Sequence, residues 1–328
     1  MGDMRGARRG LHYAIGAAVF LCAAHSLAQN YPTKTIRYVI TFDAGTSPDV
    51  VGRILAERLA RLWGQQVVVE NRVGAAGVIG TAFVAKSAPD GYTLLQANIA
   101  PNAISVSLHA RIPYDQLRDF APITRIGMTP NIITVHPSVP FKSIRQLINF
   151  AKSHPGQLSY SAGLVGTSPQ LSMELLKLQV RFDIVHIPYK SAAQGVNDTI
   201  GGQLPINISN VPALVGPVQT GRLRALAVTS AQRIVQLPDV PTMQESGVPG
   251  FEVNSWYGVA APAGTPEPLL DKLNADITSV LRMPDIQQRL TEMVIPPSPT
   301  SRQEFDQFIR AEIARWAQVI KDAGIPQQ

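Results

Sequence analysis

Two pentapeptides with almost the same sequence carry the residue types in this chain that point most clearly to chemistry. They are Gly45-Thr46-Ser47-Pro48-Asp49 and, far downstream, Gly166-Thr167-Ser168-Pro169-Gln170. Each follows an apolar run and precedes a helix-like run, so each places a glycine and small hydroxyl groups at the start of a helix. A helix start exposes unpaired N–H groups and the positive end of the helix dipole, which together favour an anion. One such start in each half of the chain predicts a clamp for a small anionic ligand.

A second interpretation is that both pentapeptides are only good helix starts, because Ser and Pro favour the first positions of any helix. The clamp requires the two starts to converge in space. A parallel α/β sheet provides that convergence, since its ligands bind beyond the carboxyl ends of the strands.

The rest of the chain alternates strand-like and helix-like runs. Strands are predicted at 35–41, 66–70, 92–96, 132–135, 158–161, 184–188, 206–209 and 223–229. Helices are predicted at 48–62, 78–86, 144–153, 169–178, 192–200, 268–282, 286–293 and 302–323. This alternation indicates an α/β protein with a parallel sheet covered on both faces, and the chain is long enough for two domains.

The N-terminal residues 1–28 have the pattern of a secretory signal peptide. Three arginines precede a short apolar run at 11–24, and Ser26-Leu27-Ala28 then offers small residues at the positions that a signal peptidase reads. The apolar run is too short for a comfortable permanent membrane span. We therefore expect export to the periplasm by general secretion, with cleavage after Ala28.

The single cysteine, Cys22, lies inside this predicted signal peptide. Leu21 before it is too large for a usual lipoprotein signal, so a lipid anchor is the less favoured alternative. Cleavage after Ala28 leaves a secreted chain without cysteine, and a protein of this size does not need disulfides for stability.

Charge and motifs narrow the function classes. Removal of residues 1–28 takes away three of 29 basic and one of 23 acidic residues and leaves a net formal charge of +4. The charges are spread along the chain without the basic cluster of a nucleic-acid face.

Gly-x-Ser-x-Gly and Walker motifs are absent from the sequence. The histidines after residue 28 are His109, His136, His154 and His186, which lack metal-ligand spacing. A catalytic triad assembled in space remains open.

Several motifs together resemble one family, the substrate-binding receptors of tripartite tricarboxylate transporters, or Bug family. They are Tyr31–Arg37, Phe42–Asp49, Val67–Arg72, Gly77–Gly80, Pro89–Leu95, His186–Lys190, Leu223–Thr229, Leu237–Thr242 and Trp256–Pro266. The resemblance covers essentially the whole chain after the predicted signal peptide.

The resemblance implies a two-lobed α/β fold of the type II periplasmic-binding-protein kind, with a hinge and an interlobe cleft. Lobe 1 would be residues 29–124 with 230–328, and lobe 2 residues 125–229. The implied function is capture of a small organic carboxylate (a dicarboxylate, an amino acid or an aromatic acid) for uptake by membrane permease subunits. Such a receptor acts as a monomer and needs neither catalysis, metal nor cofactor. The alternatives are a secreted hydrolase and a ligand-sensing module of a signalling system.

Family members grip a carboxylate with backbone amides and small polar side chains from loops of both lobes. By this resemblance the ligand-binding residues are Phe42, Asp43, Ala44, Gly45, Thr46, Ser47, Asp49, Asn98, Ser161, Ala162, Gly163, Gly166, Thr167, Ser168, Lys190, Ser191 and Ala192.

Three of the aligned positions depart from the family pattern. Thr46 stands at the usual second glycine, Asp43 at a common Pro or Ala, and Gln170 where many members have His. The carboxylate of Asp43 faces either the ligand or solvent, and we favour solvent. Because Asp49 lies in the first turn of its helix, it offsets part of the helix dipole. The second loop is therefore predicted to be the stronger anion site.

Overall fold

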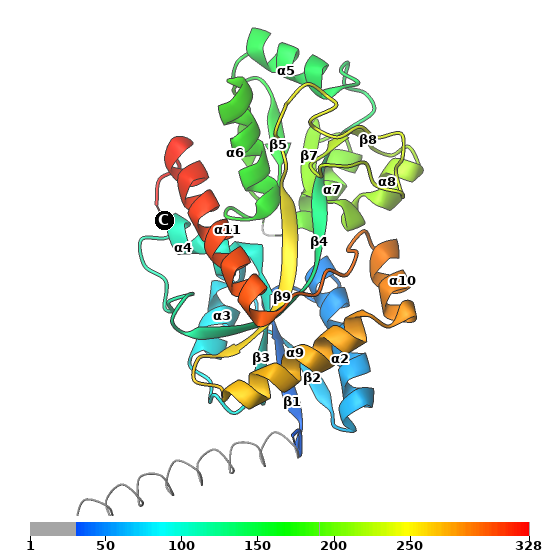
Figure 1. The fold of residues 1–328 in the computed structure, drawn as a ribbon. Coiled ribbons are helices and arrows are strands. Elements are labelled where there is room, and N and C mark those ends of the chain that lie inside the picture. Colours follow the sequence, from blue (N-terminus) through cyan, green and yellow to red (C-terminus); the bar gives the residue numbers. More distant parts are fainter. Residues whose placement is uncertain (1–30, 190, 328) are drawn as a thin grey trace, which may run out of the picture.

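The computed structural model describes residues 31–189 and 191–327 and shows a mixed α/β fold (Figure 1). The strands are β1 (Ile36–Ile40), β2 (Val67–Asn71), β3 (Thr93–Asn98), β4 (Phe120–Val135), β5 (Ser159–Ser161), β6 (Val185–Ile187), β7 (Ile206–Asn210), β8 (Arg224–Val228) and β9 (Asn254–Pro262). The longer helices are α2 (Ser47–Trp63), α3 (Val78–Ala85), α5 (Ile144–Ser153), α6 (Ser168–Val180), α7 (Ala192–Ile200), α9 (Glu267–Leu281), α10 (Pro284–Glu292) and α11 (Arg302–Asp322). Short helical segments are η1 (Ala75–Gly77), η2 (Ala100–Ile104), α4 (Ser105–Leu108), η3 (Val211–Ala213) and α8 (Val215–Gln219). The predicted signal peptide and Lys190 lie outside the described residues.

Each predicted helix and strand is present, and most ends lie within a few residues of those expected. The exception is the strand predicted at 132–135, which is the last part of a strand that begins at Phe120, and β9 was not predicted. The prediction of a parallel sheet is wrong, because the sheet is mixed. Its order is β2-β1-β3-β9-β4-β7-β5-β6, with β8 also paired to β4. Strand β1 runs parallel to β2 and β3, and β5 runs parallel to β6 and β7. By contrast, β4 is antiparallel to β7, β8 and β9, and β9 is antiparallel to β3.

The two long strands, β4 and β9, explain why the sheet contains both parallel and antiparallel pairs. Residues 120–130 of β4 pair with β9, whereas residues 131–135 pair with β7. Figure 1 shows β4 and β9 crossing from the part that carries α2 and α9 to the part that carries α5 and α6. Since the chain enters the second part along β4 and returns along β9, the two crossing strands must run in opposite directions.

Local sequence explains why β9 and the first part of β4, residues 120–131, escaped prediction. Strand β4 contains Pro122 and Pro130, and β9 contains glycine, alanine and proline, all of which are depleted in strands. Packing requires a glycine at position 258 of β9, because a side chain there would collide with the Phe305 ring of α11. Tertiary packing therefore overrides weak local preference in both strands.

Helix α11 is fixed to the crossing strand β9 by a buried carboxylate. The indole N–H groups of Trp256 and Trp316 both donate to Oε2 of Glu312, each at 3.1 Å. Glu312 and both tryptophans are buried, and Phe305 packs edge-on against Trp256. The helix begins with a capping box between Ser301 and Glu304, which sets its start. The C-terminal helix thus packs on the strands that join the two parts.

Among residues 31–189 and 191–327, none of the helices is both long and apolar enough to cross a membrane.

Candidate functional site

The first pentapeptide forms a tight loop before α2. Gly45 has a φ of +81°, a conformation that favours glycine, and its N–H donates to Oδ2 of Asp49 at 2.9 Å. Thr46 is the N-cap residue, with φ −75° and ψ 162°. Its Oγ1 donates back to the carbonyl of Asp43 at 2.6 Å. The sequence Gly-Thr-Ser-Pro-Asp is therefore one closed capping unit.

The second pentapeptide repeats this geometry before α6. Gly166 has a φ of +79°, and its N–H donates to Oε1 of Gln170 at 3.3 Å. Thr167 is the N-cap, with φ −97° and ψ 158°, and its Oγ1 donates to the carbonyl of Leu164 at 2.8 Å. The similarity of the two pentapeptides in sequence thus reflects the same local structure in both halves of the chain.

This geometry restricts which groups of each pentapeptide can hold an anion. The glycine N–H and the threonine hydroxyl hydrogen bond within their own loops. Proline supplies no N–H. The first backbone donors of a helix have no acceptor within it, so the amides of the serine after the threonine and of the residue after the proline remain. These are Ser47 and Asp49 in the first loop, where the Thr46 amide donates to the Asp43 carbonyl at 3.3 Å. In the second loop they are Ser168 and Gln170, together with Thr167, whose amide has no such bond to a described residue.

The carboxylate of Asp49 is a structural group of the first loop. It is buried and accepts hydrogen bonds from the Gly45 amide, from Arg53 at 2.9 Å and from Asn71 at 2.8 Å. Burial raises the pKa of Asp49, but the bonds from Arg53, Gly45 and Asn71 outweigh it and hold that pKa below its usual value. The negative charge stays beside the helix start and is partly balanced by Arg53.

The second loop is bonded to the crossing strands by a polar cluster formed by the buried residues Asn131, Ser168, Ser172 and Ser255 and the half-buried Asn210. The hydroxyls of Ser168 and Ser255 hydrogen bond to each other. Asn210 Nδ2 donates to Ser255 Oγ at 2.8 Å and to Asn131 Oδ1 at 2.7 Å. Asn131 Nδ2 in turn donates to Ser172 Oγ at 2.9 Å. The start of α6 is thus linked to β4, β7 and β9 at the place where the sheet changes partners.

Sequence reasoning missed Asn131, Asn210 and Ser255. Asn131 and Ser255 lie in strand segments that were not predicted, and Asn210 ends β7 one residue beyond the predicted strand. Polar residues inside or at the end of buried strands were the available signal, since buried polar groups require partners.

Two further predicted loops lie against each other. The N–H of Tyr189 donates to the carbonyl of Gly163 at 3.1 Å, and a side chain at Gly163 would lie 3.3 Å from Ala192. Ser191 caps α7 by accepting from the amide of Gln194 at 3.3 Å. Ser161 is buried and accepts from Asn207 at 2.7 Å. The predicted residues at 161–163 and at 191–192 therefore form one region.

The remaining predicted residues lie in the first loop, after β3 and beside Gly163. Phe42 is half-buried and its carbonyl accepts from Asn71 at 2.9 Å, whereas Asp43 and Ala44 are exposed. Asn98 is buried after β3, and its Oδ1 accepts from the amide of Ala100 at 3.1 Å. Ala162 is buried beside Gly163. Asn98 thus stabilises the turn that follows its strand.

A cavity of about 360 Å³ lies between the first loop and the other half of the sheet. One wall is formed by Gly45, Ser47 and Val50 at the start of α2, and a second by Pro212, Ala213 and Val215 after β7. The third is formed by Glu292 at the end of α10 and by Met293 and Val294 after it. Two of the predicted ligand-binding residues, Gly45 and Ser47, line this cavity. The residues of the second loop are not part of its lining.

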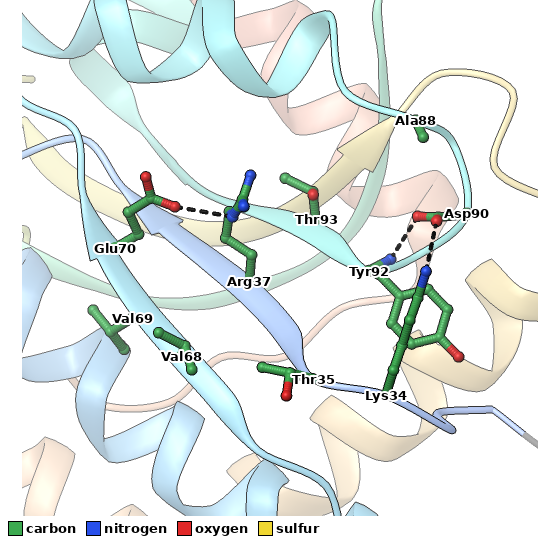
Figure 2. A pocket seen from close by; sticks show the side chains of 10 residues that line it. All are labelled: Lys34, Thr35, Arg37, Val68, Val69, Glu70, Ala88, Asp90, Tyr92 and Thr93. Atoms are coloured by element: carbon green, nitrogen blue, oxygen red, sulfur yellow. Dashed lines mark hydrogen bonds and ion pairs between the residues drawn. The ribbon is translucent and has the colours of Figure 1, made fainter.

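A larger cavity of about 560 Å³ lies elsewhere (Figure 2). It opens over β1, β2 and β3, and its charged groups form pairs: Arg37 with Glu70 at 3.0 Å and Lys34 with Asp90 at 3.5 Å. The first loop follows the carboxyl end of β1, whereas this cavity contains Thr35 and Arg37 at the strand's beginning. None of the predicted ligand-binding residues lines it, so its size alone does not make it the candidate site.

Within the part of the chain that the structure describes, no group of three or more His, Cys, Asp or Glu residues is arranged to hold a metal ion.

Comparison with known proteins identifies the family. Residues 51–325 match the family described as "Tripartite tricarboxylate transporter family receptor". The protein BugT of Bordetella pertussis is 38% identical over 303 residues, which cover 92% of this chain and 93% of BugT. The members of this family and the solved structural neighbours are substrate-binding receptors and not enzymes.

Solved structures show the same fold. The R. palustris protein Rpa4515, solved with adipate, superposes with a TM-score of 0.85 at 35% identity and covers 90% of this chain and 98% of its own. MatC from Rhodopseudomonas palustris, solved with bound malate, gives 0.81 at 28% identity and covers 88% of this chain and 100% of its own. The predicted two-lobed fold is confirmed. The chain therefore belongs to the receptor family of the tripartite tricarboxylate transporters, as its motifs predicted.

Proposed function

We propose that this protein is a periplasmic receptor that captures a small organic carboxylate between two lobes and delivers it to the membrane permease subunits of a tripartite transporter. The observation that carries this proposal is the repeated capping unit: one helix start with remaining backbone donors in each half of the fold. Relatives solved with adipate and with malate support a carboxylate as the ligand class.

The proposed lobes are residues 29–124 with 230–328, and residues 125–229. The hinge is proposed to lie where β4 changes partners from β9 to β7, near Pro130 and Asn131. Bending at two crossing strands allows each lobe to move as a rigid body and close on a ligand. We also propose that the protein is exported with cleavage after Ala28 and that it acts as a monomer.

The carboxylate is proposed to bind first at the start of α6. The amides of Ser168 and Gln170 are its donors, and Gln170 is neutral where the first loop has the charged Asp49. A carboxylate that accepts charge-assisted hydrogen bonds from several fixed donors is held without a cationic side chain. The polar cluster around Ser255 keeps these donors in place.

Calorimetry with malate, adipate and other small carboxylates tests this proposal on the exported protein. Binding of at least one acid is expected, with no detectable binding of the corresponding neutral amide. The reason is that an amide brings N–H donors into a site made of donors and has only one acceptor oxygen. If the amide binds as tightly as the acid, the pentapeptides are helix caps and the proposal is wrong.

An uptake assay in a deletion strain distinguishes a transport receptor from a ligand-sensing module. We expect a strain without this protein to lose uptake of the ligand, and a complementing copy to restore it. Loss of a transcriptional response with unchanged uptake would instead support the signalling alternative. Turnover of small esters by the purified protein would support the hydrolase alternative.

A further inference from the structure

The cavity of about 360 Å³ beside the first loop has a distinct chemical character. Its volume lies within the range of about 300–1,000 Å³ that is usual for small-molecule sites. Most of its lining is apolar, namely Val50, Pro212, Ala213, Val215, Met293 and Val294. These residues come from the start of α2, from the segment after β7 and from the end of α10, and Gly45 and Ser47 of the first loop line the same cavity, so a ligand held by the first loop would have this cavity beside it.

The ionisable side chain that lines this cavity is negative, whereas the start of α2 at Ser47 supplies backbone donors on another wall. Glu292 is its ionisable residue, and none of its lining residues within the described chain is lysine, arginine or histidine. The Glu292 carboxylate is exposed and accepts a hydrogen bond from Gln288 at 2.9 Å. On α2 and α10, Arg289 is paired with Glu57 at 3.7 Å and Arg58 with Asp285, and neither arginine lines the cavity.

We propose that this cavity is the subsite for the far end of the ligand, and that it selects a monocarboxylate with an alkyl or aryl tail over a dicarboxylate of equal length. This inference rests on the proposed function above. A second carboxylate would lose its hydration against apolar side chains and would face the like charge of Glu292. An alkyl tail there leaves water, which increases affinity about fourfold for each buried methylene.

Two matched ligand pairs test the selection by calorimetry on the exported protein. The pairs are hexanoate with adipate, and 3-phenylpropionate with 3-(4-carboxyphenyl)propionate, with acetate and malate as further probes. We expect at least tenfold tighter binding of the monocarboxylate in each pair. Equal or tighter binding of the dicarboxylate overturns the inference, as does binding of acetate or malate without either pair. If none of these acids binds, the proposed function fails as well.

Variants of the wall give a second readout. Ala213 is exposed, so Ala213→Lys places an ammonium group at the cavity without disturbing the core, and we expect the adipate-to-hexanoate affinity ratio to rise at least fivefold. Glu292→Gln is expected to raise the same ratio about twofold. The matched control Asp183→Asn removes an exposed carboxylate that does not line the cavity and is expected to change neither affinity. An unchanged ratio in both wall variants overturns the inference.

Discussion

At the scale of single residues, the two pentapeptides differ at one position that decides their electrostatics. Asp49 and Gln170 occupy the same place after the proline, and each accepts a hydrogen bond from the amide of its loop glycine. Both residues close the loop, but only Asp49 brings a charge. The same capping geometry thus presents a neutral helix start in one half of the fold and a partly compensated one in the other.

The first prediction tests this difference in charge by placing a carboxylate at the start of α6. Gln170→Glu keeps an oxygen that can accept from the Gly166 amide, but it adds a negative charge beside the proposed carboxylate site. We expect at least fivefold weaker carboxylate binding, about 1 kcal/mol, because like charges repel in a partly buried site. Calorimetry measures the affinity, and Gln157→Glu on an exposed turn is the matched control. Unchanged affinity in Gln170→Glu would remove α6 from the carboxylate site.

The second prediction concerns the pH dependence of stability through Asp49. Because its pKa is lowered in the folded state, Asp49 contributes stability above its unfolded pKa of about 4, and this contribution is lost as pH falls through the folded pKa. Asp49→Asn lacks the charge, and we expect it to unfold more easily at pH 7 by roughly 1–3 kcal/mol.

Urea denaturation at pH 7 and at pH 3 checks this expectation. The difference in unfolding free energy between the natural protein and Asp49→Asn should shrink at the lower pH. A difference that is the same at both pH values would show that the Asp49 charge does not stabilise the loop.

At the scale of elements, helix α11 depends on a single buried acceptor. Glu312 on the helix accepts from Trp256 on β9 and from Trp316 on the helix itself. Arg315 lies 3.5 Å from the second carboxylate oxygen and offsets its charge. The arrangement joins the last helix to a strand that crosses between the two halves.

The third prediction removes this acceptor. Glu312→Leu leaves two buried indole N–H groups without an acceptor, and we expect a loss of roughly 2–5 kcal/mol of unfolding free energy. Glu312→Gln keeps one oxygen and should lose less. Urea denaturation followed by tryptophan fluorescence measures both variants. Equal stability of Glu312→Leu and the natural protein would contradict the role assigned to Glu312.

At the scale of the whole molecule, the crossing strands β4 and β9 and the polar cluster at the start of α6 lie at the same place. A ligand bound at that helix start would therefore be linked, through Ser168 and Ser255, to the strands that carry the proposed hinge. We expect binding and closure to be coupled for this reason.

The fourth prediction is that the ligand closes the lobes. Small-angle X-ray scattering of the purified protein should show a smaller radius of gyration when a carboxylate is present at saturation, because a hinge motion brings the lobes together. A ligand at a hundred times its dissociation constant should also stabilise the protein by about 2.7 kcal/mol. An unchanged radius of gyration together with this stabilisation would show that binding occurs without closure.

The sequence by itself determined the helices, the strands of each half and the two capping units, because these depend on residues close together in the chain. Glycine, an N-cap hydroxyl and proline in the same order specify the same loop at both places, and amphipathic spacing specifies α2 in the same way. The family resemblance added the two-lobed fold, which the comparisons confirmed. Whether both loops bind the ligand stays a prediction.

Only the tertiary structure decided the mixed direction of the sheet, the polar partners of Ser168 and the position of the cavity beside Gly45. Strand β9 has weak strand preference, and it forms because it pairs with β3 and β4 and packs against α11. Asn131, Asn210 and Ser255 come from three separate strands, so no local pattern connects them. Contacts between distant residues require the folded backbone, and for this reason sequence spacing predicted the loops but not what surrounds them.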